Sequence, residues 1–247
     1  MTSLSIVISI KNLTKIYKNN RGIHEINLDI NRGDVFGFLG PNGAGKTTAM
    51  KVMTGLMHSD NGDVEINGLS ISRDYTGAMK SVGCIIENVT PFPYLTGYEN
   101  MSLCARFHGI GRERIEECME MTGIIKYKNE KVKNYSLGMK QRIGLSMAVL
   151  PNPSIFILDE PLNGLDIEGM VEMRNLILRL AKENNATFFI SSHLIHDVEL
   201  TCDRIGILHD GRLLRVESME NILQSFSSLE NFYLSEVDIH VNPARAG

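Results

Sequence analysis

The sequence predicts an α/β fold built on a mostly parallel sheet, with an antiparallel sheet near the N-terminus and an inserted lobe of helices. The first observation is that strand and helix patterns alternate along most of the chain, which is typical of a parallel sheet. The second is that short apolar runs at 35–40 and 154–161 indicate buried strands. The third is a stretch from about 91 to 150 with helical patterns and few candidate strands.

Strand patterns dominate the N-terminal part of the chain. In INLDI (26–30), apolar residues alternate with polar ones, which predicts a half-buried strand. Together with 5–10 and 63–67, this strand is expected to form the antiparallel sheet. The run VFGFLG (35–40) predicts a buried strand that leads into a loop, and a helical pattern follows from about Lys46 to Leu56.

Helices and strands continue to alternate in the rest of the chain. The predicted elements are helices at 111–121, at 137–150 and after Asp166, a strand at 187–193 and a hairpin at 204–217 with its turn at Asp210-Gly211. The domain is expected to span 1–225, with the helical lobe at about 91–150. Residues 226–247 form a polar, weakly patterned tail to which no function is assigned.

Composition excludes some classes of function. The 247 residues suffice for one large domain or for a core with a smaller lobe. The formal net charge is −4, and Lys and Arg are spread along the chain, so no nucleic-acid partner is expected. No apolar run approaches the roughly 20 residues of a membrane span, and the N-terminus lacks the features of a signal peptide. We therefore expect a soluble, cytoplasmic protein that can dock on a membrane partner.

The cysteines show no metal-binding pattern, because there is neither a CxxC pair nor a histidine at ligand spacing. They are Cys84, Cys104, Cys118 and Cys202. We expect reduced and mostly buried thiols, as is typical of a reducing compartment.

The most specific motif is GPNGAGKTT (40–48), which matches GxxxxGK[ST] between a predicted strand and a predicted helix. Its glycines let backbone N–H groups turn toward an anion, and the helix N-terminus adds partial positive charge. Lys46 is expected to reach the β- and γ-phosphates of a nucleoside triphosphate, and the Thr47 hydroxyl to bind Mg²⁺. A glycine-rich turn with a chance lysine is the alternative, which the complete match disfavours. The predicted nucleotide-binding residues of this P-loop NTPase core are Gly40, Pro41, Asn42, Gly43, Ala44, Gly45, Lys46, Thr47 and Thr48.

Two acidic residues, Asp159 and Glu160, follow the apolar run IFIL. The C-terminal ends of strands are where open α/β sheets bind ligands. Asp159 is expected to hold Mg²⁺ through its waters, and Glu160 to polarise the attacking water as the general base. His193 ends the next predicted strand and is expected to sense the γ-phosphate. The alternatives are a helix-capping acidic pair ahead of Pro161 and a histidine with a structural hydrogen bond.

The order of these motifs resembles the ATP-binding subunit of ABC transporters over roughly residues 5–220. The segment YSLGMKQR (135–142) looks like the family's signature segment, which Ser136 and Gly138 match. It departs from the signature at Tyr135, Leu137 and Met139. A serine hydroxyl and free N–H groups at a helix N-terminus form a second anion site. In this family, whose core is RecA-like, that site closes on the γ-phosphate of ATP held by a partner subunit.

Other positions extend the resemblance. Asp166 in LNGLD resembles the D-loop aspartate at the subunit contact, and His193 matches the family's switch histidine. Tyr17 stands where the family places an aromatic residue that stacks on adenine. Glu87 occupies the position of the Q-loop glutamine, which touches Mg²⁺ and the attacking water. A carboxylate can accept from Mg²⁺-bound water but cannot donate, so we expect Glu87→Gln to retain ATP hydrolysis.

The resemblance implies an ATPase, with ATP and Mg²⁺ as cofactors, that works as a homodimer with integral-membrane permease subunits at the cytoplasmic face of the cell membrane. Glu87, YSLGMKQR and NGLD look like the branch of bacitracin-resistance exporters and lantibiotic-immunity ATPases, and Pro91 to Tyr98 is expected to face the permease. The alternatives are an exporter of a drug, an ion or a polysaccharide, a slow regulatory subunit, and a non-transport ATPase of translation or DNA repair. Substrate contacts belong to the permease, so the sequence of this chain does not identify the transported molecule.

Overall fold

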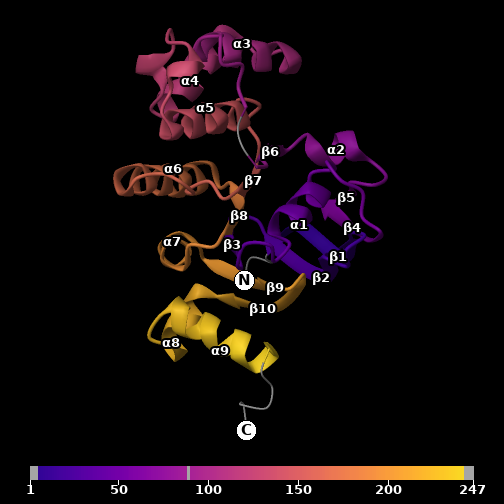
Figure 1. The fold of residues 1–247 in the computed structure, drawn as a ribbon. Coiled ribbons are helices and arrows are strands. Elements are labelled where there is room, and N and C mark those ends of the chain that lie inside the picture. The colour runs from indigo at the N-terminus through magenta and orange to yellow at the C-terminus, as the bar shows by residue number, and fades with distance from the viewer. Residues whose placement is uncertain (1–4, 88–89, 242–247) are drawn as a thin grey trace.

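The computed structural model describes residues 5–87 and 90–241, which form two sheets, a set of surrounding helices and a separate helical lobe (Figure 1). The larger sheet has the strand order β10-β9-β3-β8-β7-β6, and the smaller has the order β2-β1-β4-β5. The strands of the larger sheet are β3 (Val35–Leu39), β6 (Val82–Ile85), β7 (Ile155–Asp159), β8 (Thr187–Ser192), β9 (Arg204–His209) and β10 (Arg212–Ser218). Those of the smaller sheet are β1 (Ile6–Ile16), β2 (Gly22–Asn31), β4 (Asn61–Ile66) and β5 (Leu69–Ser70).

The larger sheet is parallel from β9 to β6, while β10 pairs with β9 in the antiparallel direction. All residues of β3, β7 and β8 are buried, as expected of strands covered on both faces. Leu39 pairs with Ser192, and Asp159 pairs with Ser191. The C-terminal ends of these three strands therefore meet at one edge, directly before the predicted phosphate loop, acidic pair and histidine. The predicted α/β fold is confirmed.

The smaller sheet is antiparallel, as predicted, and packs against helix α1 (Lys46–Met53). Ile8 and Leu13 of β1 belong to the same buried cluster as Met50 of α1 and Phe38 of β3. Helix α1 therefore lies between the two sheets (Figure 1). Because the phosphate loop leads into α1, both sheets fix its position.

The helical lobe consists mainly of α3 (Gly97–His108), α4 (Arg112–Met121) and α5 (Leu137–Val149), at the top of Figure 1. Helix α3 begins with a capping box, in which Thr96 Oγ1 accepts from the Glu99 N–H and the Glu99 carboxylate accepts from the Thr96 N–H. The chain enters the lobe after β6 and leaves it before β7, and these two strands are hydrogen-bonded neighbours. A Cβ added at Gly83 of β6 would lie 2.5 Å from the carbonyl oxygen of Ala148, so α5 lies directly against this strand.

Five further α-helices and two short 3₁₀ helices complete the described chain. The α-helices are α2 (Tyr75–Met79), α6 (Ile167–Asn184), α7 (Ile195–Thr201), α8 (Met219–Ser225) and α9 (Leu229–Val241), and the 3₁₀ helices are η1 (Ile125–Tyr127) and η2 (Val132–Asn134).

Most of the segment interpreted from the sequence as a polar, weakly patterned tail (226–247) forms helix α9 in the structure. Leu229 and Phe232 of this helix are buried, and the Phe232 ring packs edge-on against Phe226 at a centroid distance of 5.2 Å. The periodicity is weak because apolar Leu234 of the same helix is exposed, so apolar residues are not confined to one face. Residues 242–247 lie outside the described part of the chain.

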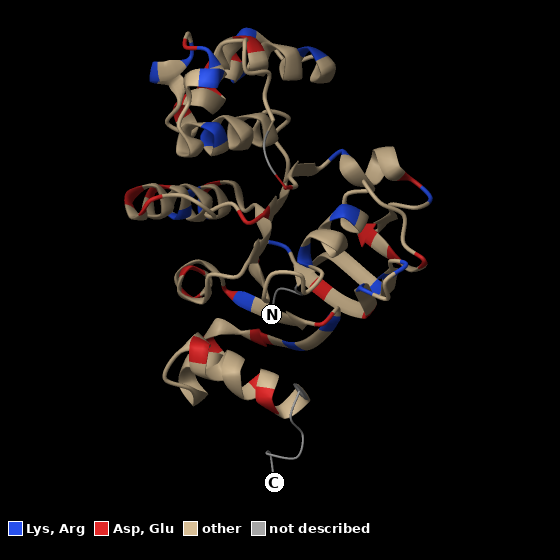
Figure 2. Ribbon diagram, viewed as in Figure 1, with Lys and Arg blue, Asp and Glu red and all other residues tan. Residues whose placement is uncertain are grey.

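Three expectations from composition can be compared with the structure. No helix among the described residues is long and apolar enough to cross a membrane. Lys and Arg are distributed over several elements rather than gathered on one (Figure 2). Cys118 and Cys202 are buried, and burial raises the pKa of the Cys118 thiol to about 11. Cys104 is half-buried and Cys84 is exposed, so the expectation of buried thiols is correct for two of the four.

Candidate active site

The loop between β3 and α1 is held in place by close contacts at its glycines. Gly45, at the N-cap of α1, has a φ of 109°, and a Cβ added there would lie 2.7 Å from Ile23 Cγ2. A Cβ added at Gly40 would lie 2.3 Å from the carbonyl oxygen of Leu208. Both positions therefore require glycine. The loop leaves the free N–H groups of the first turn of α1 to bind an anion.

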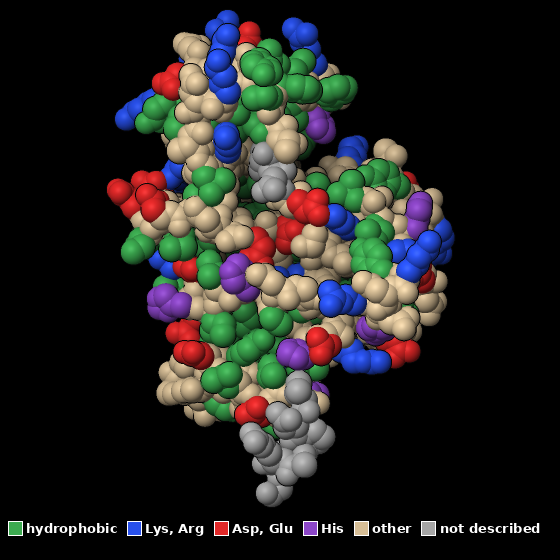
Figure 3. Space-filling model, viewed as in Figure 1, with side chains coloured by type: hydrophobic (Ala, Val, Ile, Leu, Met, Phe, Trp, Pro, Cys, Tyr) green, Lys and Arg blue, Asp and Glu red, His purple; other side chains and the backbone are tan. Residues whose placement is uncertain are grey.

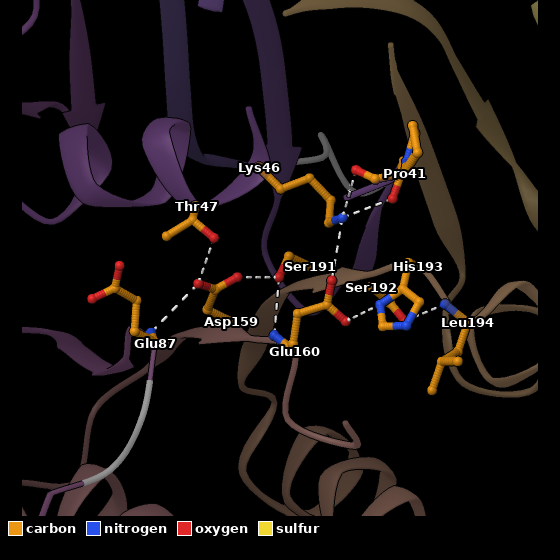
Figure 4. A network of polar contacts seen from close by, with 11 residues as sticks. Pro41, Lys46, Thr47, Glu87, Asp159, Glu160, Ser191, Ser192, His193 and Leu194 are labelled. Atoms are coloured by element: carbon orange, nitrogen blue, oxygen red, sulfur yellow. Dashed lines mark hydrogen bonds and ion pairs between the residues drawn. The ribbon is translucent and has the colours of Figure 1, made fainter. Parts of the chain in front are cut away.

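Lys46 is buried at the centre of the site, with a relative exposure of 5%. Its ammonium donates to the carbonyl oxygens of Gly40 at 2.7 Å and Pro41 at 3.2 Å, and it lies 3.2 Å from Glu160 Oε1 (Figure 4). A buried charge needs such partners to offset its loss of hydration. The lysine is therefore fixed within the loop, where a phosphate chain bound by the loop would reach it.

The Asp159 carboxylate is oriented by two hydroxyl groups. Thr47 Oγ1 donates to Asp159 Oδ2 at 2.8 Å, and Ser191 Oγ donates to Asp159 Oδ1 at 2.5 Å. Ser191 also accepts a hydrogen bond from the Glu160 N–H at 2.9 Å (Figure 4). One buried serine on β8 thus holds both acidic residues of β7 and the turn after it.

Glu160 and His193 are in contact at the same edge of the larger sheet, beside Asp159. His193 Nδ1 lies 2.8 Å from Glu160 Oε2, and Lys46 meets the other oxygen of this carboxylate. Glu160 has a φ of 48°, in the left-handed region that is unusual for a non-glycine residue. Such backbone strain is often found at functional sites, and here it places the Glu160 carboxylate between a cation and an imidazole.

Glu87 contributes its backbone to this network. Its N–H lies 3.4 Å from Asp159 Oδ2, whereas its carboxylate forms an ion pair with Lys51 of α1. Figure 4 shows the carboxylate directed away from Asp159. The structure therefore places the predicted metal-binding carboxylate beside the site, in contact with Lys51 rather than with Thr47 or Asp159.

Tyr17 lies directly after β1, at the edge of the phosphate loop. Its hydroxyl is 3.3 Å from Thr48 Oγ1 and 3.4 Å from Met57 Sδ. The side chain is partly exposed, with a relative exposure of 39% for the residue. The side chain is thus partly accessible to solvent near the loop, and stacking on a base would require an accessible ring.

The signature residues and Asp166 lie apart from the phosphate loop. Ser136 is the N-cap of α5 and accepts from the Met139 N–H at 3.2 Å, while Asp166 is the N-cap of α6 and accepts from the Gly169 N–H at 2.9 Å. Ser136, Gly138 and Asp166 line one cavity, whereas Thr47 and Glu160 line another. The predicted signature residues and the phosphate loop therefore line two different cavities.

The cleft beside Asp159 and Glu160 lies between the core and the helical lobe. It has a volume of about 580 Å³ and is lined by core residues and by Gln141 of α5. Figure 3 shows acidic side chains in this hollow. The position of the lobe therefore sets the width of the cleft next to the acidic pair.

The oxygen ligands at the end of β7 fit Mg²⁺. The Thr47 hydroxyl and the Asp159 carboxylate are adjacent, and Mg²⁺ in proteins is commonly held by one or two such groups together with substrate phosphates. The described residues contain no group of three or more His, Cys, Asp and Glu side chains that could bind a metal by itself. The donor set is therefore suited to a metal that arrives with a nucleotide.

Ser191 and Lys51 are the functional candidates that the sequence interpretation missed. For Ser191 a signal existed, because the serines of TFFISSH are polar residues in an otherwise apolar strand and buried hydroxyls need partners. For Lys51 there was none, because its partner Glu87 is 36 positions away in the chain.

Comparison with known sequences identifies relatives over most of the chain. Residues 23–163 match the family model described as ABC transporter. The chain is 44% identical to the uncharacterised ABC transporter ATP-binding protein YhcH of Bacillus subtilis (strain 168), covering 87% of this chain and 71% of YhcH. It is 38% identical to the bacitracin transport ATP-binding protein BcrA of Bacillus licheniformis, covering 94% and 76% of the two chains. It is 34% identical to the lantibiotic transport ATP-binding protein SrtF of Streptococcus pyogenes, covering 90% and 96%.

Solved structures show the same architecture. The ATP-binding subunit of an ABC transporter superposes with a TM-score of 0.81 at 26% identity, covering 94% of this chain and 99% of that subunit. A dimeric ATP-binding cassette in a post-hydrolysis state, bound to ADP and Pi, superposes with a TM-score of 0.77 at 28% identity, covering 86% and 98%.

Proposed function

The chain belongs to the ABC transporter family, and from this premise we propose that it hydrolyses ATP to drive export of a peptide antibiotic or lantibiotic through a separate membrane permease. The observation that carries the catalytic part is the cluster of Lys46, Asp159, Glu160 and His193 at the ends of adjacent strands. The substrate class is supported by the relatives BcrA and SrtF, whose names refer to transport of bacitracin and lantibiotics.

In the proposed reaction Glu160 is the general base. One of its carboxylate oxygens accepts a proton from the attacking water, whose oxygen bonds to the γ-phosphorus as the bond to the β–γ bridging oxygen breaks. Lys46 binds the β- and γ-phosphates, and His193 orients the Glu160 carboxylate through their 2.8 Å contact. Mg²⁺ held by Thr47 and Asp159 would neutralise phosphate charge. Glu87, assigned to the metal from its sequence position, would reach it only after leaving Lys51.

We further propose that two chains pair head to tail to complete each site. The support is that Ser136 and Gly138 line a different cavity from Thr47 and Glu160, so one chain supplies two separate halves. In such a dimer the N-terminal end of α5 meets the phosphates held by the partner subunit, where its free N–H groups and the Ser136 hydroxyl bind an anion.

The surface proposed for the permease is the turn that precedes α3. Phe92 and Tyr94 are exposed by 63% and 75%, and an exposed apolar surface commonly marks a contact site. The buried Asn100 side chain accepts from the Phe92 N–H at 2.8 Å and donates to the Phe92 carbonyl at 3.1 Å, so the turn is rigid. Contact here would hold the ATPase at the cytoplasmic face of the membrane.

The catalytic part of the proposal is tested with Glu160→Gln, which removes the base but keeps the shape of the side chain. We expect this variant to accumulate as an ATP-bound dimer in size-exclusion chromatography, with hydrolysis lowered by at least about 100-fold. Lys46→Ala should remove nucleotide binding and therefore dimer formation. Glu183→Gln, at the exposed end of α6, is the matched control and should behave as wild type. A Glu160→Gln protein that stays monomeric with ATP and hydrolyses it at the normal rate would refute the assignment.

The substrate is tested by expressing the chain with its neighbouring permease genes in a sensitive host. We expect a raised minimum inhibitory concentration for bacitracin or a lantibiotic, and loss of this protection with Lys46→Ala. Protection against an unrelated drug alone would assign the chain to an exporter of another substrate.

A further inference from the structure

We propose that Asp60 is a positioning residue for Tyr17 and holds its ring in place to stack on the adenine base of ATP. This inference rests on the proposed function, in which Tyr17 is the adenine contact. Asp60 lies directly before β4, in the segment that connects α1 to the smaller sheet.

Asp60 fixes the end of β1 at the two residues before Tyr17. Asp60 Oδ2 accepts from the Ile16 N–H at 2.7 Å, and Asp60 Oδ1 accepts from Lys15 Nζ at 2.7 Å. The Asp60 N–H in turn donates to the Thr14 carbonyl oxygen at 2.8 Å. Strand β4 begins at Asn61, so the Asp60 carboxylate binds the Ile16 N–H where the ladder between β1 and β4 has ended.

Of the two Asp60 side-chain contacts, the hydrogen bond from the Ile16 N–H is the one that holds the backbone before Tyr17. A carboxylate accepting from a backbone N–H makes a stronger hydrogen bond than a neutral acceptor does. The Ile16 N–H is also the main reason that the pKa of Asp60 lies below its ordinary value, followed by the hydrogen bond from Lys15. The Lys15 pair is solvent-accessible and is expected to contribute little by itself.

The hydroxyl end of Tyr17 is held by the same part of the chain. Thr48 lies in α1, and Met57 lies in the segment between α1 and Asp60. The Met57 N–H donates to the Lys51 carbonyl oxygen at 3.1 Å. The backbone before Tyr17 and the hydroxyl of its ring are thus both fixed by residues 48–60. Because α1 also begins at the phosphate loop, this segment sets the distance between the phosphate site and the aromatic ring.

The sequence allows a direct measurement, because the chain contains no tryptophan. Tyr17→Trp places the only tryptophan of the variant at the proposed adenine contact, where it can be excited selectively over the tyrosines. We expect ADP to quench its emission and inorganic pyrophosphate to leave it unchanged, because only ADP carries a base. ADP is used because it is not hydrolysed. An emission that ADP does not change would refute the adenine role of Tyr17, and with it this part of the proposed function.

The role of Asp60 is then tested by Asp60→Ala in the Tyr17→Trp background and in the wild-type chain. We expect ADP affinity to fall by about three- to tenfold in calorimetry, because part of the base stacking is lost, with pyrophosphate affinity unchanged within about twofold. The tryptophan anisotropy should also fall, because the backbone before it loses the Ile16 hydrogen bond to Asp60 and is then held mainly by its pairing with β2. Asp60→Asn keeps an acceptor for the Ile16 N–H and should restore most of the affinity, and Lys15→Met should stay near wild type.

Two outcomes would overturn the proposal while leaving the adenine contact intact. One is quenching by ADP with unchanged affinity and anisotropy in Asp60→Ala. The other is an equal loss of ADP and pyrophosphate affinity, which would indicate a general structural role. If Asp60→Ala fails to fold, Asp60→Ser, whose hydroxyl is one bond too short to reach the Ile16 N–H, carries the test, and it must then lower ADP affinity without lowering that for pyrophosphate.

Discussion

Asp159 and Glu160 are adjacent in the sequence, yet their carboxylates have different partners. Asp159 accepts from Thr47 and Ser191, whereas Glu160 contacts Lys46 and His193. The left-handed φ of Glu160 accompanies this divergence. The hydroxyl-bound carboxylate suits a metal ligand, and the carboxylate beside an imidazole suits a proton acceptor. Two identical functional groups can therefore serve two purposes within one turn of chain.

Ser191→Ala is predicted to lower kcat for ATP hydrolysis by about tenfold, corresponding to about 1.4 kcal/mol, with a small effect on KM. The reason is that this buried hydroxyl holds the Asp159 carboxylate and the Glu160 N–H together. Steady-state ATPase kinetics provide the measurement. Ser192→Ala is the matched control, because the Ser192 hydroxyl accepts from the Leu194 N–H instead. Equal losses in the two variants would argue against a specific role.

Glu87→Gln is predicted to retain ATP hydrolysis within about threefold of wild type. The substitution keeps the backbone N–H near Asp159 and removes only the ion pair with Lys51, and exposed pairs contribute about 0–1 kcal/mol. Lys51→Met removes the same pair from the other side and should have a similar effect in the same assay. Loss of turnover in Glu87→Gln alone would show that the carboxylate is required at the metal.

At the scale of the element, the start of α3 shows how local sequence fixes the lobe. Thr96 and Glu99 exchange hydrogen bonds across the first turn, and the Gly97 N–H donates to the Glu130 carbonyl at 3.1 Å. The cap thus determines both where α3 begins and how the turn with the exposed aromatic rings is presented.

Thr96→Ala is predicted to lower the free energy of unfolding by about 1 kcal/mol, as loss of an N-cap usually does. The backbone N–H of Thr96 holds the pKa of the Glu99 carboxyl below its ordinary value. The charged form is therefore favoured in the folded state, and this stabilisation is present above the unfolded pKa and lost as the pH falls through the folded pKa. Urea unfolding of wild type and Glu99→Gln should differ at pH 7 and converge in acid. A difference that persists below the folded pKa would contradict the cap.

Most elements could be predicted from the sequence because their signals are local. The alternation in INLDI and the apolar runs at 35–40 and 154–161 correspond to β2, β3 and β7. Helix α9 was missed because its burial depends on Phe226 and on contacts with α7, which no local period reveals. The same holds within the site: the loop containing Lys46 follows from its motif, whereas the pairing of Glu87 with Lys51 depends on where distant segments return.

At the scale of the molecule, the C-terminal helices extend the buried core past β10. Leu229 and Phe232 belong to the same apolar cluster as residues of the lobe and of the parallel sheet, including Ile143 and Phe188. The Leu229 N–H donates to Glu199 Oε2 at 2.6 Å, which ties the start of α9 to α7. Helix α9 is therefore part of the folded domain.

Phe232→Ala is predicted to lower the free energy of unfolding by about 3 kcal/mol, through lost burial and the cavity left behind. Leu234→Ala, at an exposed position of the same helix, is the matched control and should change it by less than about 0.5 kcal/mol. Both values are obtained from denaturant unfolding curves. Equal small effects would show that α9 is dispensable for stability.

The close approach of Gly83 to Ala148 provides a point about which α5 could rotate. This contact pins one end of the helix to β6, while Leu137, beside the signature serine, is eleven residues away, which is about 16 Å along the helix axis. A turn of the lobe by about 10° about the pinned end would move Leu137 by about 3 Å, comparable to the length of a hydrogen bond. Small angular changes at the sheet edge are thus amplified at the far end of α5. A side chain larger than hydrogen at position 83 would push the Ala148 end of α5 away from β6.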